Sequence, residues 1–485
     1  ITLPDSVTTL GTEIFWGCSS LKSITLSKNI TSIERYTFYD CNSLTSIVIP
    51  ENVTSIGGSA FCGCSSLEKI SIPDSITEID SGVFYNCKNL TDIILPEHIT
   101  AIKFSTFHGC SSLKNITIPE SVTTIGLGAF EESGITGIII PKNVTSIEAG
   151  DESGAFLKCD NLSYIQVDKE NTVYDSRDNC NAIIQTKDNS LLVGSSNTTI
   201  PEGVTSIGSK AFYGSGLTNI YIPVNITSIK YNAFWECHDL KSIQVDEKNT
   251  VYDSRNNCNA IIQTENNSLI VGSSGTIIPN DVAIIDADAF HGSGITEITI
   301  PSNVLQMQND AFESCNSLVK VTILSGITEI SNGTFGKCQK LEKVVIPDSV
   351  TKLGGWVFWK CKNLKNINLP ESITGIGESV FYGCSSLESI VIPSEVTVIE
   401  DSLFSGCNNL TEVTISQNVT KIGTTAFQGC SNLKKINIPD NLTKIDEYAF
   451  DGCDNLTSII WKDIEYKSIA DFSDAFENAG NTFYW

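Results

Sequence analysis

One phenylalanine recurs every 23 residues along most of the chain, and this period constrains the fold more than any other feature of the sequence. The pattern around each of these anchor phenylalanines is roughly I-P-x-x-V-T-x-I-x-x-x-A-F-x-x-C-x-x-L-x-x-I-x-I-P. A period in the twenties is typical of a solenoid, in which each repeat forms one coil that packs on the next. We therefore expect one repeat array, although the length of 485 residues would otherwise suggest several domains. The anchors are Phe15, Phe38, Phe61, Phe84, Phe107, Phe130, Phe156, Phe212, Phe234, Phe290, Phe312, Phe335, Phe358, Phe381, Phe404, Phe427 and Phe450.

Each repeat contains two short extended segments and a turn, as residues 67–87 illustrate. In LEKISIP (67–73) apolar residues alternate with polar ones, as in a strand that ends at proline. SITEI (75–79) gives a second, shorter extended segment on the opposite side, and SGVFYNC (81–87) makes a tight turn that brings Phe84 and Cys87 inside. Because one repeat cannot bury this apolar face alone, we predict a repeat solenoid of stacked parallel β-strands about 4.8 Å apart.

The repeat resembles the BspA-like leucine-rich repeat family, the 23-residue type found on bacterial and some protist cell surfaces. The residues that carry the resemblance are LPDSVTTLGTEIFWGCSSLKSITL (3–26) and IPSEVTVIEDSLFSGCNNLTEVTI (392–415). The resemblance covers nearly the whole chain and implies a curved leucine-rich-repeat array of about 17 repeats over residues 1–463. The resemblance predicts the fold specifically but says little about the function, because the family is defined by its repeat scaffold.

The regular period is interrupted at several places. Three repeats lose one residue and replace the cysteine by serine, at Ser133-Gly134, Ser215-Gly216 and Ser293-Gly294, and EAGDESG (148–154) is a small insertion. Two larger insertions, 165–200 and 243–278, are near copies of one another. AIIQT and SLLVGS flank a short polar loop in the first copy, which predicts a hairpin. The insertions are either ordinary variants of the scaffold or projections that shape a recognition surface.

The repeat ends after Trp461, and residues 464–485 are expected to cap the array. SIADFSDAF (468–476) begins with a capping box, Ser468 with Asp471, and places Ile469, Phe472 and Phe476 on one helical face. The end of a solenoid exposes apolar ladders unless it is covered. We therefore predict a C-terminal helical cap.

The cysteines and histidines fit packing better than chemistry. All but three of the 17 cysteines, Cys62, Cys180 and Cys258, lie three residues after an anchor phenylalanine. Cysteines in a straight ladder cannot converge on one zinc ion as a tetrahedron. Their parallel Cβ vectors also suit a disulfide poorly. We therefore predict buried free thiols rather than disulfides or a metal site. His108 and His291 follow an anchor, in a slot that elsewhere holds aromatic residues. We predict no catalytic residues, no metal site and no cofactor.

The charge of the chain excludes some partners. The net charge is -25, and no cluster of Lys and Arg is present, so neither nucleic acid nor an anionic membrane surface is an expected partner. No apolar run approaches the length of a membrane span, so this segment is not expected to insert into a membrane. The chain begins in mid-repeat, so a signal peptide is not visible, and the family resemblance implies an extracellular or cell-surface location.

A recognition surface is expected where outward strand positions carry tyrosine and amide side chains. These positions lie eight and ten residues after each anchor, or one fewer in the shortened repeats. In the middle repeats they hold Tyr164, Gln166, Asn219, Tyr221, Ser242 and Gln244. Tyrosine with amide partners is typical of adaptable binding surfaces, although β-propensity alone also accounts for such residues.

Three functions are compatible with this pattern. The first is non-enzymatic adhesion, in which a secreted or surface-displayed monomer recognises a host or microbial protein or a glycan. The alternative is an inert structural spacer that presents another domain away from the cell. An enzyme is not expected, because no catalytic set is visible; it would require a deep pocket with converging polar groups.

Overall fold

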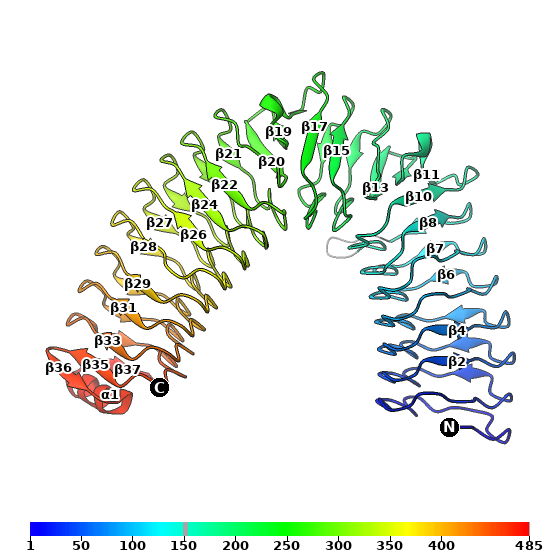
Figure 1. Ribbon diagram of the computed structural model, residues 1–485, viewed down its shortest axis with the longest axis horizontal. Helices are drawn as coiled ribbons and strands as arrows, with labels where there is room; N and C mark the ends of the chain where they lie inside the picture. The colour runs from blue at the N-terminus through cyan, green and yellow to red at the C-terminus, as the bar shows by residue number, and fades with distance from the viewer. Residues whose placement is uncertain (149–153, 485) are drawn as a thin grey trace. The chain divides into compact units, whose positions relative to one another are not determined.

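Parallel strands stacked coil upon coil form the body of the protein (Figure 1). The computed structural model describes residues 1–148 and 154–484, so most of the 148–154 insertion lies outside the described residues. The chain divides into two compact units, Ile1–Cys237 and His238–Trp485, which are described separately. The fold class predicted from the repeat is confirmed, whereas the division into a 1–463 array and a 464–485 cap stays a prediction.

A long-strand row is formed by the first extended segment of each repeat. Neighbouring strands pair in register one repeat apart, as Ile47 does with Ile70 and Val321 with Val344. Apolar residues of these strands point inward and the residues between them point to solvent, as the alternation in the sequence predicts. In the first unit the row contains β2 (Ser46–Val48), β4 (Lys69–Ser71), β8 (Gly137–Ile140), β10 (Tyr164–Val167) and β15 (Asn219–Ile222); in the second it contains β17 (Ser242–Val245), β22 (Glu297–Ile300), β24 (Lys320–Ile323), β26 (Lys343–Val345), β29 (Ser389–Val391), β31 (Glu412–Thr414), β33 (Lys435–Asn437) and β35 (Ser458–Trp461).

A short-strand row follows from the V-T-x-I segment of each repeat. Each strand has two residues, of which the second, usually Ile, is buried in the core in most strands and half-buried in β9 and β16. In the first unit the row contains β1 (Ser32–Ile33), β3 (Ser55–Ile56), β5 (Glu78–Ile79), β6 (Ala101–Ile102), β7 (Thr124–Ile125), β9 (Ser146–Ile147), β14 (Ser206–Ile207) and β16 (Ser228–Ile229); in the second it contains β21 (Ile284–Ile285), β23 (Gln306–Met307), β25 (Glu329–Ile330), β27 (Lys352–Leu353), β28 (Gly375–Ile376), β30 (Val398–Ile399), β32 (Lys421–Ile422) and β34 (Lys444–Ile445).

The anchor phenylalanines form stacked ladders inside each unit. In the second unit the ring centroids of Phe358 and Phe381 are 5.7 Å apart, and those of Phe381 and Phe404 are 5.6 Å apart, with nearly parallel planes. Most anchors are fully buried. Because burial of one Phe side chain stabilises a protein by about 1.5–3 kcal/mol, the ladder supplies a core that no single repeat could form.

The turn around each anchor places side chains at two outward positions, two residues before the phenylalanine and one residue after it. The first position has a left-handed backbone, for example in Ser59 (φ 55°), Gly82 (φ 66°) and Trp356 (φ 56°). Glycine adopts this conformation without strain, whereas a bulky residue does not. These two positions form the turn edge of each unit.

The ladder cysteines pack inside and donate to the preceding coil. The Sγ atom of Cys64, for example, lies 3.1 Å from the carbonyl oxygen of Phe38. Burial raises the pKa of the Cys41 thiol to about 11 and that of the Cys159 thiol to about 12. The exception is Cys18, which is exposed, because it lies in the first coil; the expectation of burial is therefore wrong for this residue.

The two large insertions are built into the stack. In the first, β11 (Tyr174–Asp175), η1 (Arg177–Asn179), β12 (Ala182–Gln185) and β13 (Ser190–Gly194) follow in order; in the second, β18 (Tyr252–Asp253), η2 (Arg255–Asn257), β19 (Ala260–Gln263) and β20 (Ser268–Gly272) do the same. The predicted hairpin is confirmed, since β12 pairs antiparallel with β13. Because β13 then pairs with β14, and Ile184 and Leu191 are fully buried, the insertion serves the scaffold here and does not project from it.

The C-terminal residues form β36 (Ile464–Tyr466), α1 (Ile469–Asn478) and β37 (Thr482–Phe483). Ser468 caps the helix by accepting a hydrogen bond from the backbone N–H of Asp471, as the capping box predicts. Phe472 and Phe476 are fully buried beside Trp461. The predicted C-terminal helix is confirmed, and β37 adds a last strand to the short-strand row by pairing with β34.

Candidate functional site

The predicted recognition residues of the first unit lie on two outward strand faces. Tyr164 is 46% exposed on β10, and its hydroxyl hydrogen-bonds Oε1 of Gln166 on the same strand. The ring lies over Gly137 of β8, where a Cβ atom would come within 3.3 Å of it. Ile139, which is 54% exposed, pairs with Gln166 across the two strands. Tyrosine, amide and apolar surface are therefore contiguous on β8 and β10.

The other four predicted residues are not joined to this patch by strand pairing. Asn219 and Tyr221 lie on β15, and Tyr221 is 46% exposed. Among the described strands, β15 is not paired with β10. The physical reason is the first insertion, whose strand β12 lies against β10. In the second unit Gln244 is exposed on β17 and Ser242 is half-buried. The sequence correctly placed all six side chains on the long-strand row, but it did not foresee this separation.

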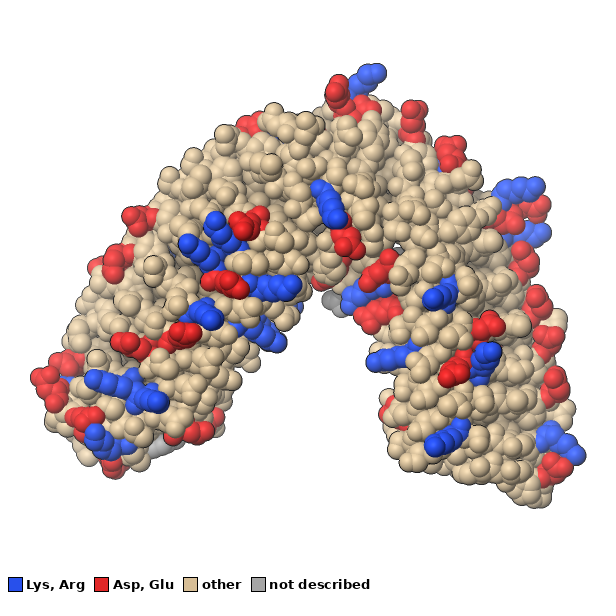
Figure 2. All heavy atoms as spheres, viewed as in Figure 1, with Lys and Arg blue, Asp and Glu red and all other residues tan. Residues whose placement is uncertain are grey.

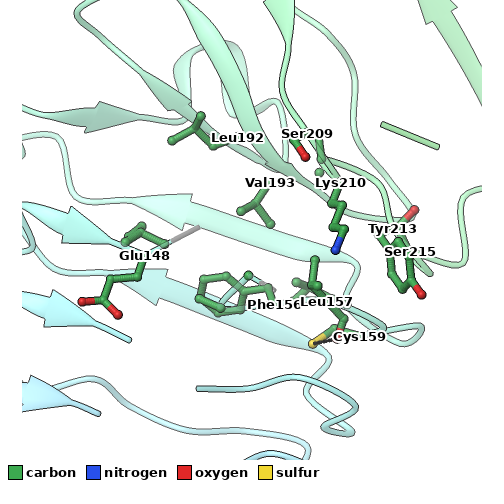
Figure 3. A pocket seen from close by; sticks show the side chains of 16 residues that line it. Glu148, Phe156, Leu157, Cys159, Leu192, Val193, Ser209, Lys210, Tyr213 and Ser215 are labelled. Carbon is green, nitrogen blue, oxygen red and sulfur yellow. Dashed lines mark hydrogen bonds between the residues drawn. The ribbon is translucent and has the colours of Figure 1, made fainter. Parts of the chain in front are cut away.

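A small cavity of about 40 Å³ lies where the first insertion meets the coil of Phe156 (Figure 3). Val193 of β13, Phe156, Cys159 and Tyr213 line it. The cavity exists because β13 interrupts the phenylalanine ladder. It has room for a water molecule and is far below the roughly 300 Å³ of a small-molecule site, so it is a packing seam.

A larger hollow of about 650 Å³ opens on the turn edge of the second unit, and we call it the Trp356 hollow. Asp310 and Glu313 line one side, and Trp356 and Trp359 line the other. The coil between them carries glycine at both turn-edge positions, Gly333 and Gly336, and the side chains of Asp310 and Trp359 lie over these two glycines. The aromatic slot after each anchor was read from the sequence as packing only. Two glycines between an acidic coil and an aromatic coil are the signal that could have revealed the hollow.

The carboxylates of the hollow sit in a crowded electrostatic environment. Burial, with Glu313 and Asp288 nearby, raises the pKa of Asp310 to about 6, against the opposing effect of His291 and Lys337. Glu313 is paired with Lys337 at 2.8 Å, and the Lys337 and Lys360 ammonium groups lie 4.8 and 4.7 Å from the ring centroid of Trp359. The ring of Trp359 is therefore already engaged by cations of the chain itself.

Replacing Asp310 with asparagine is expected to stabilise the protein at pH 7.5 by roughly 1 kcal/mol, a value discounted for solvent screening. A pKa raised to about 6 in the folded state makes the ionised form costly above pH 6. As the pH falls from 6 toward the ordinary pKa of aspartate, Asp310 is protonated in the folded protein before it is protonated in the unfolded chain. The stability difference between the wild type and the variant therefore shrinks. Urea unfolding of both proteins at pH 7.5 and pH 4 measures the effect. An equal gain at both pH values would contradict this explanation.

One group of side chains has the composition of a metal site. Ligand atoms of Asp288, His291 and Glu313 lie within 4.8 Å of one another, the only such group of three among residues 1–148 and 154–484. The Nδ1 atom of His291 is 3.4 Å from a carboxylate oxygen of Asp288 and 3.7 Å from one of Glu313. Because Lys337 already neutralises Glu313, a cation would have to displace it. We therefore describe the group as a polar contact beside the hollow.

The visible surface carries acidic and basic side chains interspersed rather than gathered by sign (Figure 2). This distribution agrees with the lack of a basic cluster in the sequence. In the described part of the chain, no helix has both the length and the apolar character needed to cross a membrane.

Comparison with known proteins identifies a repeat family. The model of a family described as "BspA type Leucine rich repeat region (6 copies)" matches residues 1–103, 77–186, 192–273, 273–388 and 375–481. No curated protein matches the chain. A leucine-rich repeat protein from Bacteroides ovatus is 25% identical with a TM-score of 0.34, over 86% of this chain and 91% of that one. A leucine rich cell surface protein from Faecalibacterium prausnitzii is 27% identical with a TM-score of 0.33, over 91% and 85%. A leucine-rich repeat protein of T. pallidum is 30% identical with a TM-score of 0.31, over 39% and 90%.

Proposed function

The chain belongs to the BspA-type leucine-rich repeat family, and on that premise we propose that it is a bacterial surface or secreted protein that adheres to an extracellular protein. Members of the family are bacterial surface proteins, and their repeat arrays suggest a role in protein interactions. Such arrays are typically non-enzymatic. The proposal of a specific adhesive contact goes beyond the family.

The observation that carries the proposal is the exposed tyrosine on the long-strand row of the first unit. Tyr164, Gln166 and Ile139 form one contiguous patch, and Tyr221 presents a second exposed ring on β15. Tyrosine supplies a large contact area at low entropic cost, and the neighbouring amide supplies hydrogen bonds. The rigid, hydrogen-bonded strands beneath fix these side chains, which reduces the entropy lost on binding.

Changing Tyr164 and Tyr221 together to alanine is expected to weaken binding to the protein ligand about tenfold or more, the effect typical of aromatic interface residues. Immobilised laminin, collagen and fibronectin are suitable first probes, with surface plasmon resonance as the measurement. Val48→Ala is the matched control, because Val48 is 72% exposed on β2 of the same unit. Unchanged binding by the double variant would remove this site. Failure of the wild type to bind any probe would favour the inert spacer.

A further inference from the structure

We propose that the Trp356 hollow binds a neutral sugar ring of an oligosaccharide, stacked on the faces of Trp356 and Tyr382. This site lies in the second unit, on the turn edge, and does not depend on the proposed protein contact in the first unit. The ligand class follows from the unoccupied aromatic rings, the polar groups around them and the balance of charge.

Three aromatic rings line the hollow, and two of them, Trp356 and Tyr382, have no aromatic ring or ammonium group against their faces among the described residues. Trp356 is 42% exposed and Tyr382 is 40% exposed. Aromatic side chains on the turn edge of the first unit behave differently: Trp16 stacks on Tyr39 at 4.4 Å. A pyranose ring presents a flat C–H face of the size that an indole or phenol ring covers, and it would supply the missing contact.

The backbone at Trp356 follows the rule of the repeat. Its φ of 56° lies in the left-handed region, as does that of the equivalent residues in the two adjacent coils, Gly333 (φ 62°) and Ser379 (φ 55°). Tyr448 occupies the same position at φ 57°, so the position tolerates aromatics and supplies a control.

Polar groups suited to hydroxyls surround the rings. Asn309 and Asn332 are exposed at the hollow, and the carboxylate of Asp310 and the hydroxyl of Ser379 also line it. The Oδ1 atom of Asn332 accepts a hydrogen bond from the backbone N–H of Gly355 at 2.8 Å, which fixes its amide. Amide, carboxylate and hydroxyl groups together donate to and accept from the hydroxyls of a sugar.

The charges of the hollow disfavour an ionic ligand. Glu313 is neutralised by Lys337, and the lining of the hollow includes Lys360 as well as Asp310, so both signs of charge are present. The lysine ammonium groups over Trp359 already occupy the position that a quaternary ammonium ligand would need. An anionic sugar would meet Asp310 and Glu313. A neutral, polyhydroxylated ring avoids both conflicts.

The dimensions suit more than one sugar unit. A second hollow of about 510 Å³ shares Trp356 and Asn332 with the first and is floored by Gly354, Gly355 and Gly377. A Cβ atom on Gly377 would lie 2.5 Å from the backbone nitrogen of Gly355, so glycine is needed here for the close approach of two neighbouring coils. An oligosaccharide could therefore continue past Trp356.

The test is titration of the full chain with cellohexaose, chitohexaose, maltohexaose and laminarihexaose, followed by calorimetry and tryptophan fluorescence. At least one of these neutral probes is expected to bind more tightly than choline or an oligogalacturonate. Trp356→Gly should weaken that binding about tenfold or more, since it removes the stacking face. Glycine also relieves the left-handed backbone, so this variant is expected to remain folded.

The second ring is tested separately. Tyr382→Phe should retain binding, whereas Tyr382→Ser should lose it.

The control is Tyr448→Gly, which makes the same backbone change at an exposed residue outside the hollow and should leave affinity unchanged. The proposal is overturned if no neutral probe binds, if an ionic probe binds more tightly, or if Trp356→Gly and Tyr448→Gly bind alike. Loss of protein binding in the Tyr164 and Tyr221 variant has no effect on these outcomes, so the two proposals fail independently.

Discussion

Replacing Phe381 with alanine is expected to lower the free energy of unfolding of the second unit by about 3–5 kcal/mol. The ring is fully buried and stacks on Phe358 and Phe404 on its two sides, at 5.7 and 5.6 Å. Alanine would leave a cavity between two coils whose backbones are held apart by their own hydrogen bonds. The neighbouring coils cannot close this gap without breaking the strand pairing, so the cavity persists.

Urea unfolding of the intact chain, followed by circular dichroism, measures this loss. Each coil contacts only its neighbours, so the weakened region is expected to unfold separately and to broaden or split the transition. Phe381→Leu should lose less, because it keeps most of the apolar volume. Val391→Ala is the control, since Val391 is 57% exposed on the long-strand row. If Phe381→Ala costs no more than this control, the ladder is not what holds the coils together.

Replacing Gly272 with alanine is expected to destabilise the second unit by about 2–3 kcal/mol or more, because the added methyl group has no space. A Cβ atom at this position would lie 2.1 Å from Cε1 of Phe290 and 2.4 Å from its Cζ atom. Gly272 ends β20 of the second insertion, and that strand lies against the face of the next anchor ring. Gly194 and Phe212 repeat the same contact in the first unit, with a closest distance of 2.1 Å.

The matched control for Gly272→Ala is Gly375→Ala on β28. A Cβ atom there would meet only Cγ of Lys352, at 3.7 Å, so the change should be neutral or slightly stabilising. Combining Gly272→Ala with Phe290→Leu should cost less than the sum of the two single changes, because both act on one contact. Thermal unfolding of the wild type, the two single variants Gly272→Ala and Phe290→Leu, and the double variant measures this difference. Strict additivity would show that the methyl group and the ring do not meet.

Much of the scaffold could be predicted because the repeat imposes the same local rule many times. The alternation in LEKISIP places Ile70 inward on β4, and the 23-residue period sets the pairing of Ile47 with Ile70. Proline after many of the long strands, the polar loop of the inserted hairpin and the capping box at Ser468 are local signals. Each of them acts over a few residues, so no long-range information is needed.

The functional surface was harder to predict, because it depends on which side chains become neighbours. Tyr164 occupies the first outward position of its strand and Tyr221 the second position of its own strand. The inserted strand β12 lies against β10, and β15 does not pair with β10. At the Trp356 hollow, Asp310 and Trp359 lie over Gly333 and Gly336, which have no side chains of their own. A motif search for chemistry-bearing residues overlooks such an absence. The raised pKa of Asp310 depends on its burial, and then on Glu313 and on Asp288, which belongs to the preceding coil.

The pairing of β37 with β34 determines how the last coil meets other molecules. Thr482 donates its backbone N–H to Thr443, and Tyr484 donates to Ile445, so these carbonyl groups are already satisfied. An uncovered strand at this place would be a template for a further polypeptide, and identical copies could then add end to end. With β37 on the short-strand row, the exposed pairing groups at this end are those of a strand of two residues, which is a shorter template than an open coil.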